Sequence, residues 1–176
     1  TEENIYVLDS PVLSNTQFDK FVSYFDNKYQ IFDCTFLEDQ SLESAINNLK
    51  KETEVAVRKG VTQIILTDKN VKENSYPIPT LLSVGAVHTH LVKQGLRGYV
   101  SINAQSGECL DTHSFATVIG VGATTINPYL ALDSLYQRFQ KKLFGSLTFD
   151  ECVSRYIKSV NLGLLKIMSK MGISVL

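Results

Sequence analysis

The stretch that decides the fold reads Gln63-Ile64-Ile65-Leu66-Thr67, a short run that is β-branched and almost continuously apolar. Such a run is typical of a parallel strand that is covered on both faces. An amphipathic helix is predicted before it, with apolar residues at helical spacing from Leu42 to Val57 and Ser41 as its cap. Two prolines, in Pro77-Ile78-Pro79, introduce a second helix from about Thr80 to Gln94. The sequence therefore predicts a buried strand between two helices.

The same alternation continues on both sides of this unit. It predicts strands at about 31–36, 99–103 and 123–126, and helices at about 113–119 and 128–142. Strands and helices that alternate at these lengths favour a parallel sheet with right-handed crossovers. The fold class is therefore α/β, built from parallel β/α units. Four units are half of an eightfold barrel and could equally form an open sheet, which periodicity does not distinguish.

The two ends of the chain complete one predicted domain, residues 1–176. Residues 1–30 are expected to form an N-terminal arm and a helix capped by Ser14-Asn15, and residues 31–145 the β/α core. Residues 146–176 are expected to form a long C-terminal helix. It begins with the capping box of Thr148 and Glu151 and ends at Gly172.

The composition excludes several classes of partner. The net charge of −1 provides no basic surface for nucleic acid, and no apolar run approaches the roughly 20 residues of a membrane span. Cys34, Cys109 and Cys152 are odd in number and widely spaced, which favours reduced, buried thiols in the cytoplasm or a plastid stroma. The chain starts without Met, so we expect a processed or cut end.

The histidines do not predict a metal site. His88 and His90 are two residues apart on a predicted helix and point roughly 200° away from each other. We expect one of them to be buried and hydrogen-bonded and the other to face solvent. His113 is expected to cap or pack near the start of the next helix. No residue is predicted as a catalytic, cofactor-binding or metal-binding group.

Two further patterns have a structural and a functional interpretation. Gly120-Val121-Gly122-Ala123 precedes a predicted strand, so a helix end and tight turn is favoured over a phosphate-binding loop. Asp68, Asn103 and Asn127 are predicted at the carboxyl ends of strands, where barrel enzymes place catalytic groups. Loop-forming roles are favoured for these three residues, and a ligand site is the alternative.

Four blocks of sequence resemble one family in their order and spacing. They are Ser10-Pro11-Val12-Leu13-Ser14-Asn15, Leu81 to Leu91, Ile126 to Ala131, and Gly163 to Ser174. Together they resemble the central domain of the large glutamate synthase polypeptide over about residues 10–174.

This resemblance implies a degraded, TIM-barrel-like (half-barrel) fold and a connecting role without catalysis. The parent enzyme makes L-glutamate from L-glutamine and 2-oxoglutarate. Its amidotransferase domain releases ammonia, which passes through a tunnel to a synthase domain that carries FMN and a [3Fe-4S] cluster. Electrons come from ferredoxin or a pyridine-nucleotide-linked small subunit. The resemblance implies no cofactor in this chain, no activity for the fragment alone, and a tunnel-lining role for Ser14 and Asn15. The alternative for these two residues is that they only cap a helix.

The chain departs from the family pattern at two places. It has Gln105-Ser106-Gly107 where Glu-Thr-Gly or Glu-Ser-Gly is common, and His113-Ser114 where paired histidines are common. These departures weaken any binding role there and leave the predicted fold unchanged. Two alternative functions remain. One is a free-standing barrel-like domain that binds a phosphate or flavin at its strand ends, and the other is a degenerate regulatory module.

Overall fold

A four-stranded parallel sheet organises the protein, which we describe from a computed structural model covering residues 6–175. The strands are β1 (Tyr29–Asp33), β3 (Gln63–Thr67), β5 (Ser101–Gln105) and β6 (Thr125–Asn127), and they lie in the order β1-β3-β5-β6. Every residue of β3 is buried, as predicted for a strand covered on both faces.

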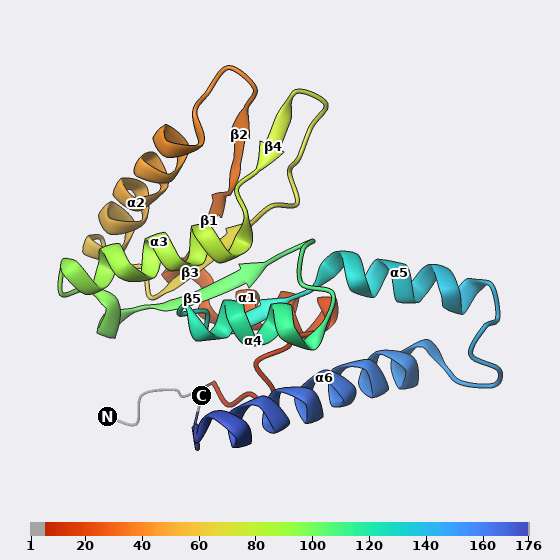
Figure 1. Cartoon of the computed structure of the whole chain (residues 1–176). Helices are drawn as coiled ribbons and strands as arrows, with labels where there is room; N and C mark the ends of the chain where they lie inside the picture. Colours follow the sequence, from red (N-terminus) through yellow and green to blue (C-terminus); the bar gives the residue numbers. More distant parts are fainter. Residues whose placement is uncertain (1–5, 176) are drawn as a thin grey trace.

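The sheet is wound in one direction. Its strand order follows the chain order, so each crossover moves to the next position and the order never reverses, unlike in a doubly wound sheet. Three helices, α2 (Leu42–Arg58), α3 (Thr80–Lys93) and α4 (Thr112–Gly120), cover one face (Figure 1). The sheet is open, and its winding is that of half a barrel.

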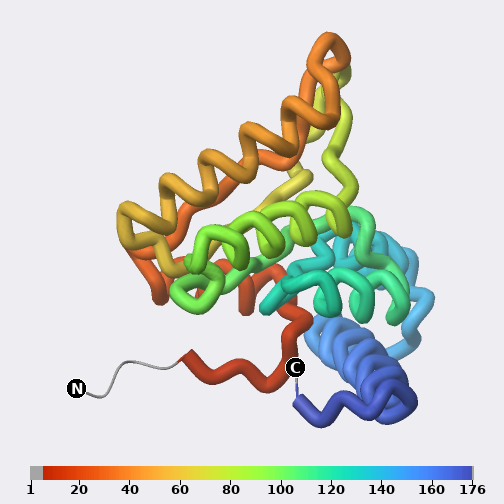
Figure 2. Tube along the Cα trace, turned by 60° about the vertical axis from the view of Figure 1, so that its left-hand side comes forward, coloured from red at the N-terminus to blue at the C-terminus, as the bar shows by residue number. Residues whose placement is uncertain are grey.

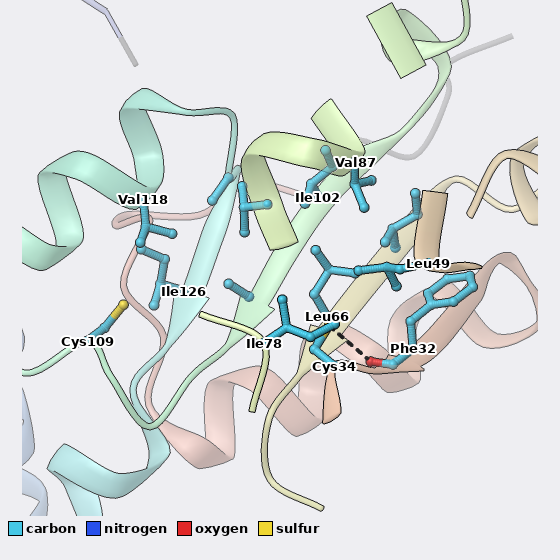
Figure 3. Packing of buried hydrophobic residues seen from close by; sticks show 14 of the residues in the cluster. Phe32, Cys34, Leu49, Leu66, Ile78, Val87, Ile102, Cys109, Val118 and Ile126 are labelled. Atoms are coloured by element: carbon cyan, nitrogen blue, oxygen red, sulfur yellow. Dashed lines mark hydrogen bonds between the residues drawn. The ribbon is translucent and has the colours of Figure 1, made fainter. Parts of the chain in front are cut away.

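The helix-covered face forms the main hydrophobic core. Figure 3 shows Leu66 from β3 beside Leu49 of α2, Ile102 from β5 beside Val87 of α3, and Ile126 from β6 beside Val118 of α4. Fully burying each aliphatic side chain of this size contributes about 1.5–3 kcal/mol. The apolar side of α2, predicted from its helical spacing, therefore packs in this core.

The N-terminal segment covers the opposite face and one edge of the sheet. Helix α1 (Asn15–Phe25) places Phe18 and Phe21 against Ile65, the middle residue of β3. Just before α1, the chain runs parallel to β6. The Leu13 amide donates to the Ile126 carbonyl at 2.9 Å, and the Ile126 amide donates to the Pro11 carbonyl at 2.8 Å. Residues 11–13 thus occupy the edge where a fifth barrel strand would lie.

The prediction of one strand at 31–36 was wrong. β1 ends at Asp33, whose carboxylate accepts a hydrogen bond from the Thr35 amide at 3.1 Å and turns the chain. A second strand, β2 (Thr35–Leu37), pairs antiparallel with β4 (Ser75–Pro77) in a ribbon that projects from the sheet (Figure 1). β4 lies between the predicted strand at 63–67 and the predicted helix from Thr80, where no strand was expected.

The third predicted strand, at 99–103, is displaced by two residues. A 3-10 helix at Arg97–Tyr99 replaces its start, and β5 begins at Ser101, which is the register partner of Gln63. Tyr99 is 72% exposed, so its aromatic ring is not part of the sheet.

Two helices complete the chain, α5 (Tyr129–Gln140) and α6 (Phe149–Met171). The long C-terminal helix is confirmed, including its capping box: Glu151 accepts from the Thr148 amide at 2.8 Å, and Thr148 accepts from the Glu151 amide at 3.3 Å. Gly172 ends the helix with φ +70°, a left-handed conformation that favours glycine. Figure 2, which views α6 nearly along its axis, shows the N-terminal segment passing beside it.

Candidate functional site at the carboxyl ends of the strands

Polar side chains fill part of the sheet face that points toward α1. Successive side chains of a strand alternate between faces, so this face receives Asn103 while its neighbours enter the main core. Asn103 donates to Gln63 Oε1 and to the Ile64 carbonyl, both at 3.1 Å, and accepts from the Thr125 hydroxyl at 2.7 Å. Asn103 is fully buried in the middle of β5 and not at its end, which corrects the prediction.

A second row of hydrogen bonds crosses the strand ends themselves. The Thr67 hydroxyl donates to Gln105 Oε1 at 2.8 Å, and Gln105 Nε2 donates to Asn127 Oδ1 at 3.1 Å. Asn127 Nδ2 then donates to Asn15 Oδ1 at 3.0 Å and to the Leu13 carbonyl at 3.1 Å. We call Thr67, Gln105, Asn127 and Asn15 the strand-end network. It joins three strands to the N-terminal segment.

The two predicted site residues have different positions. Ser14 caps α1: its hydroxyl accepts from the Gln17 amide at 3.2 Å, and Gln17 Oε1 accepts from the Ser14 amide at 2.9 Å. Asn15 is exposed and reaches the strand ends through Asn127. Sequence reasoning missed Thr67 and Gln105. The alternation of polar residues at 101, 103 and 105 was the signal that could have revealed Gln105.

Asp68 follows β3, as predicted, and binds the loop after β5. Both of its carboxylate oxygens accept from the Gly107 amide at 3.0 Å, and the Ser106 hydroxyl donates at 3.5 Å. Burial raises the pKa of the Asp68 carboxyl, and hydrogen bonds from Gly107 and Tyr129 oppose that shift. All of these partners are supplied by the protein itself, so Asp68 acts here as a connection between two loops.

The same loop holds the start of α3. The Thr80 amide donates to Glu108 Oε2 at 2.9 Å, and the hydroxyls of Thr80 and Ser106 lie 2.6 Å apart. A carboxylate at a helix N-terminus satisfies an amide that has no partner within the helix. Gln105, Ser106 and Gly107, where the chain departs from the family pattern, thus all make internal hydrogen bonds.

Both histidines of α3 are half-buried, so the expectation of one buried and one solvent-facing histidine was wrong. His88 Nδ1 accepts from Arg97 Nε at 3.0 Å, and His90 Nε2 lies 2.7 Å from Glu54 Oε2 on α2. His113 is exposed near the start of α4. The cap expected of it is supplied by Asp111, which accepts from the Ser114 amide at 2.8 Å.

Gly122 forms a turn, as predicted, between α4 and β6. Its φ is +124°, and a Cβ atom added to it would lie 2.3 Å from His88 Nδ1. Its carbonyl accepts from the Arg97 guanidinium at 2.9 Å. Glycine is therefore required here by both backbone conformation and close packing.

The three cysteines are buried thiols, as predicted. Burial raises the pKa of Cys34 to about 12 and that of Cys109 to about 11, so both stay protonated and unreactive at neutral pH. Within residues 6–175, no three His, Cys, Asp or Glu side chains converge on a point that could hold a metal ion. In that same range, no helix is both long and apolar enough to cross a membrane.

Comparison with known proteins gives a consistent result. The family model described as "Glutamate synthase central domain" matches residues 1–176. The chain is 44% identical over 179 residues to the "Glutamate synthase [NADPH] large chain" of Azospirillum brasilense, covering 100% of this chain and 12% of that one. It is also 44% identical to the Bacillus subtilis (strain 168) large chain over 169 residues, which is 95% of this chain and 11% of that one.

A plant enzyme and one solved structure complete the comparison. The "Ferredoxin-dependent glutamate synthase, chloroplastic" of Oryza sativa subsp. japonica is 40% identical over 184 residues, covering 96% of this chain and 11% of that one. A putative fructose-1,6-bisphosphate aldolase from Coccidioides immitis aligns with a TM-score of 0.37 and 13% identity, over 80% of this chain and 56% of that one. The chain thus spans about an eighth of the length of its curated relatives. By the match over its whole length, it belongs to the glutamate synthase central domain family.

Proposed function

We propose that residues 1–176 act as one non-catalytic connecting domain of a glutamate synthase large polypeptide. In this role the domain links the glutamine amidotransferase domain to the FMN-binding, 2-oxoglutarate-reducing synthase domain and helps to wall the ammonia tunnel. FMN and the [3Fe-4S] cluster belong to other parts of that polypeptide, which receives electrons from ferredoxin or a pyridine-nucleotide-linked subunit. The compartment is the cytoplasm or a plastid stroma. Family membership supports this proposal.

The strand-end network is the observation that carries the non-catalytic part of the proposal. Barrel enzymes leave polar groups at the carboxyl ends of their strands available for substrate. In this chain, Thr67, Gln105 and Asn127 bind one another, and residues 11–13 lie against the adjacent edge. Asp68, the carboxylate at these ends, is bound by Gly107 and Ser106. Internal hydrogen bonds thus engage the polar groups that a barrel enzyme would offer to a substrate, which supports a non-catalytic role.

Asn15 is the residue through which this edge could meet ammonia. Its side chain is exposed, uncharged and held by Asn127, so it offers a fixed polar group at the surface of the domain. Ammonia is a small neutral molecule that both donates and accepts hydrogen bonds. A carboxylate would attract its protonated form, ammonium, and a cationic side chain would repel that form. An uncharged amide does neither. Ser14, whose hydroxyl is used by the helix cap, would contribute to the wall mainly by its position.

The test is performed in the longer polypeptide that this function requires. An immunoblot of the source extract comes first: a band several times larger than 19.7 kDa is expected, and a band at that mass overturns the proposal. Asn15→Leu then replaces the polar group by an apolar one of similar size. We expect ammonia released into solution per glutamine hydrolysed to rise severalfold, with the rate of glutamine hydrolysis retained.

Asn48→Leu is the matched control, since Asn48 is an exposed asparagine on α2 outside the strand-end network. If Asn15→Leu releases no more ammonia than Asn48→Leu, Asn15 does not line the tunnel.

A further inference from the structure

An apolar groove lies between α4, α6 and the N-terminal segment, away from the strand ends. We call it the α4–α6 groove. It has a volume of about 1040 Å³ and is lined by residues 8–11 and 121–124, the exposed side of α4, and the last two turns of α6. Ile167 and Met168 are half-buried there, whereas Met171 and Ile173 are 70% and 43% exposed. Apolar side chains exposed around a hollow of this kind are a candidate contact surface for a protein segment.

The groove also contains a cation that lacks a carboxylate partner. The Arg97 guanidinium donates to His88 Nδ1, the Gly122 carbonyl and the Val100 carbonyl, all of them neutral acceptors. Within residues 6–175 no carboxylate lies within salt-bridge distance of it, although Asp9 also lines the groove. Arg97 is half-buried, so its charge is only partly compensated by water.

We propose that the α4–α6 groove is the docking site of an amphipathic segment from another part of the same long polypeptide, with its apolar side on α6 and a carboxylate at Arg97. This inference rests on the proposed function. The curated relatives are about eight times longer than the chain, so most of such a polypeptide lies outside it. The groove is lined both by residues 8–11 and by residues 167–173, so it lies beside both ends of the described chain.

The two methionines of the chain provide the test, because both line the groove. Dilute hydrogen peroxide oxidises exposed methionine to the sulfoxide, which mass spectrometry quantifies. In the 176-residue chain alone we expect Met168 and Met171 to be oxidised readily. In the long polypeptide we expect both to be oxidised at least tenfold more slowly. A Leu143→Met reporter, at a residue that is 65% exposed and outside the groove, should react equally in both.

A second pair of variants tests the charge. In the long polypeptide, Arg97→Gln should raise the oxidation rate of both methionines severalfold, whereas Arg58→Gln, an exposed arginine on α2, should not. Arg97→Lys keeps the charge and should retain most of the protection. Arg97→Gln could also lower the melting temperature. The comparison of methionine oxidation rates between Arg97→Lys and Arg97→Gln then still shows whether the charge at this position is responsible for the protection.

Two outcomes overturn the inference. Equal methionine oxidation in the two proteins means that no segment covers the groove. Protection in the short chain that increases with protein concentration means that a second copy covers it. Either result can occur while Asn15→Leu still uncouples ammonia transfer, so failure of this inference is distinct from failure of the proposed function.

Discussion

Replacing Asn127 should loosen the N-terminal segment more than any other single change at the strand ends. Asn127 is 1% exposed and makes hydrogen bonds to Gln105, Asn15 and the Leu13 carbonyl. Each such bond contributes about 0.5–1.5 kcal/mol net. Asn15 is exposed, so its bond belongs at the low end of this range. We therefore expect Asn127→Ala to lower the free energy of unfolding by about 1.5–3.5 kcal/mol.

Two measurements separate this effect from a general loss of stability. Urea denaturation gives the change in the free energy of unfolding, and hydrogen exchange reports the local opening of residues 10–15. The Leu13 amide should exchange faster, about tenfold for each 1.4 kcal/mol of lost local stability, because its acceptor is Ile126 beside the altered residue. Asn48→Ala, at an exposed position on α2, should change neither measurement.

Asn127→Asp sharpens the same test, because it changes hydrogen bonding with almost no change of shape. The carboxylate still accepts from Gln105 but faces the oxygens of Leu13 and Asn15, to which it cannot donate. Burial and these oxygens should raise the pKa of the new acid in the folded state. The destabilisation is then largest above that pKa and decreases as the pH falls through it. A loss below about 0.5 kcal/mol in Asn127→Ala, with unchanged exchange at Leu13, would refute this account of the strand ends.

Two other predictions concern the turn around Gly122. Gly122→Ala should destabilise the protein by more than about 2 kcal/mol in urea denaturation, because it combines a φ of +124° with a contact to His88. Gly60→Ala is the control for the backbone cost alone, since Gly60 has a φ of +98° and no neighbour within 4 Å, and it should be less destabilising. Burial and the nearby Arg97 lower the pKa of His88, so its contribution to stability is complete above the unfolded pKa of about 6.5 and is lost as the pH falls toward the lower folded value. Stability measured between pH 7.5 and 5 should therefore fall less steeply in His88→Gln, and an unchanged slope would contradict this assignment.

Local patterns predicted those parts of the fold that depend on neighbours in sequence. The strand at 63–67 follows from its β-branched apolar residues, and the capping box of Thr148 and Glu151 follows from side chains three residues apart. Ser14 was correctly expected at a cap, and its partner in the structure, Gln17, lies within one helical turn. These interactions are local, so no tertiary information is needed to find them.

Errors arose where pairing between distant strands determines the boundaries. β2 and β4 are three residues each, too short to have a periodicity of their own, and α2 and β3 separate them in the sequence. The start of β5 at Ser101 is fixed by its pairing with β3, which moved Asn103 from the predicted strand end to the middle. The strand-end network could not be predicted, since it joins Thr67, Gln105 and Asn127 from three strands to Asn15.

The polar residues between the sheet and α1 are better explained by register than by stability. Apolar side chains would be buried equally well in several registers of the N-terminal segment. Amide side chains form hydrogen bonds only in the register that brings each donor to its acceptor. A shift of residues 10–13 by one position along β6 would separate the Leu13 carbonyl from Asn127 and turn the buried Val12 to the opposite face. Both costs apply at once, so the segment has one favourable register. Under the proposed function the register also sets the position of Asn15. A one-residue slip moves the chain about 3.3 Å, which would take the Asn15 side chain out of hydrogen-bonding distance of ammonia in the tunnel.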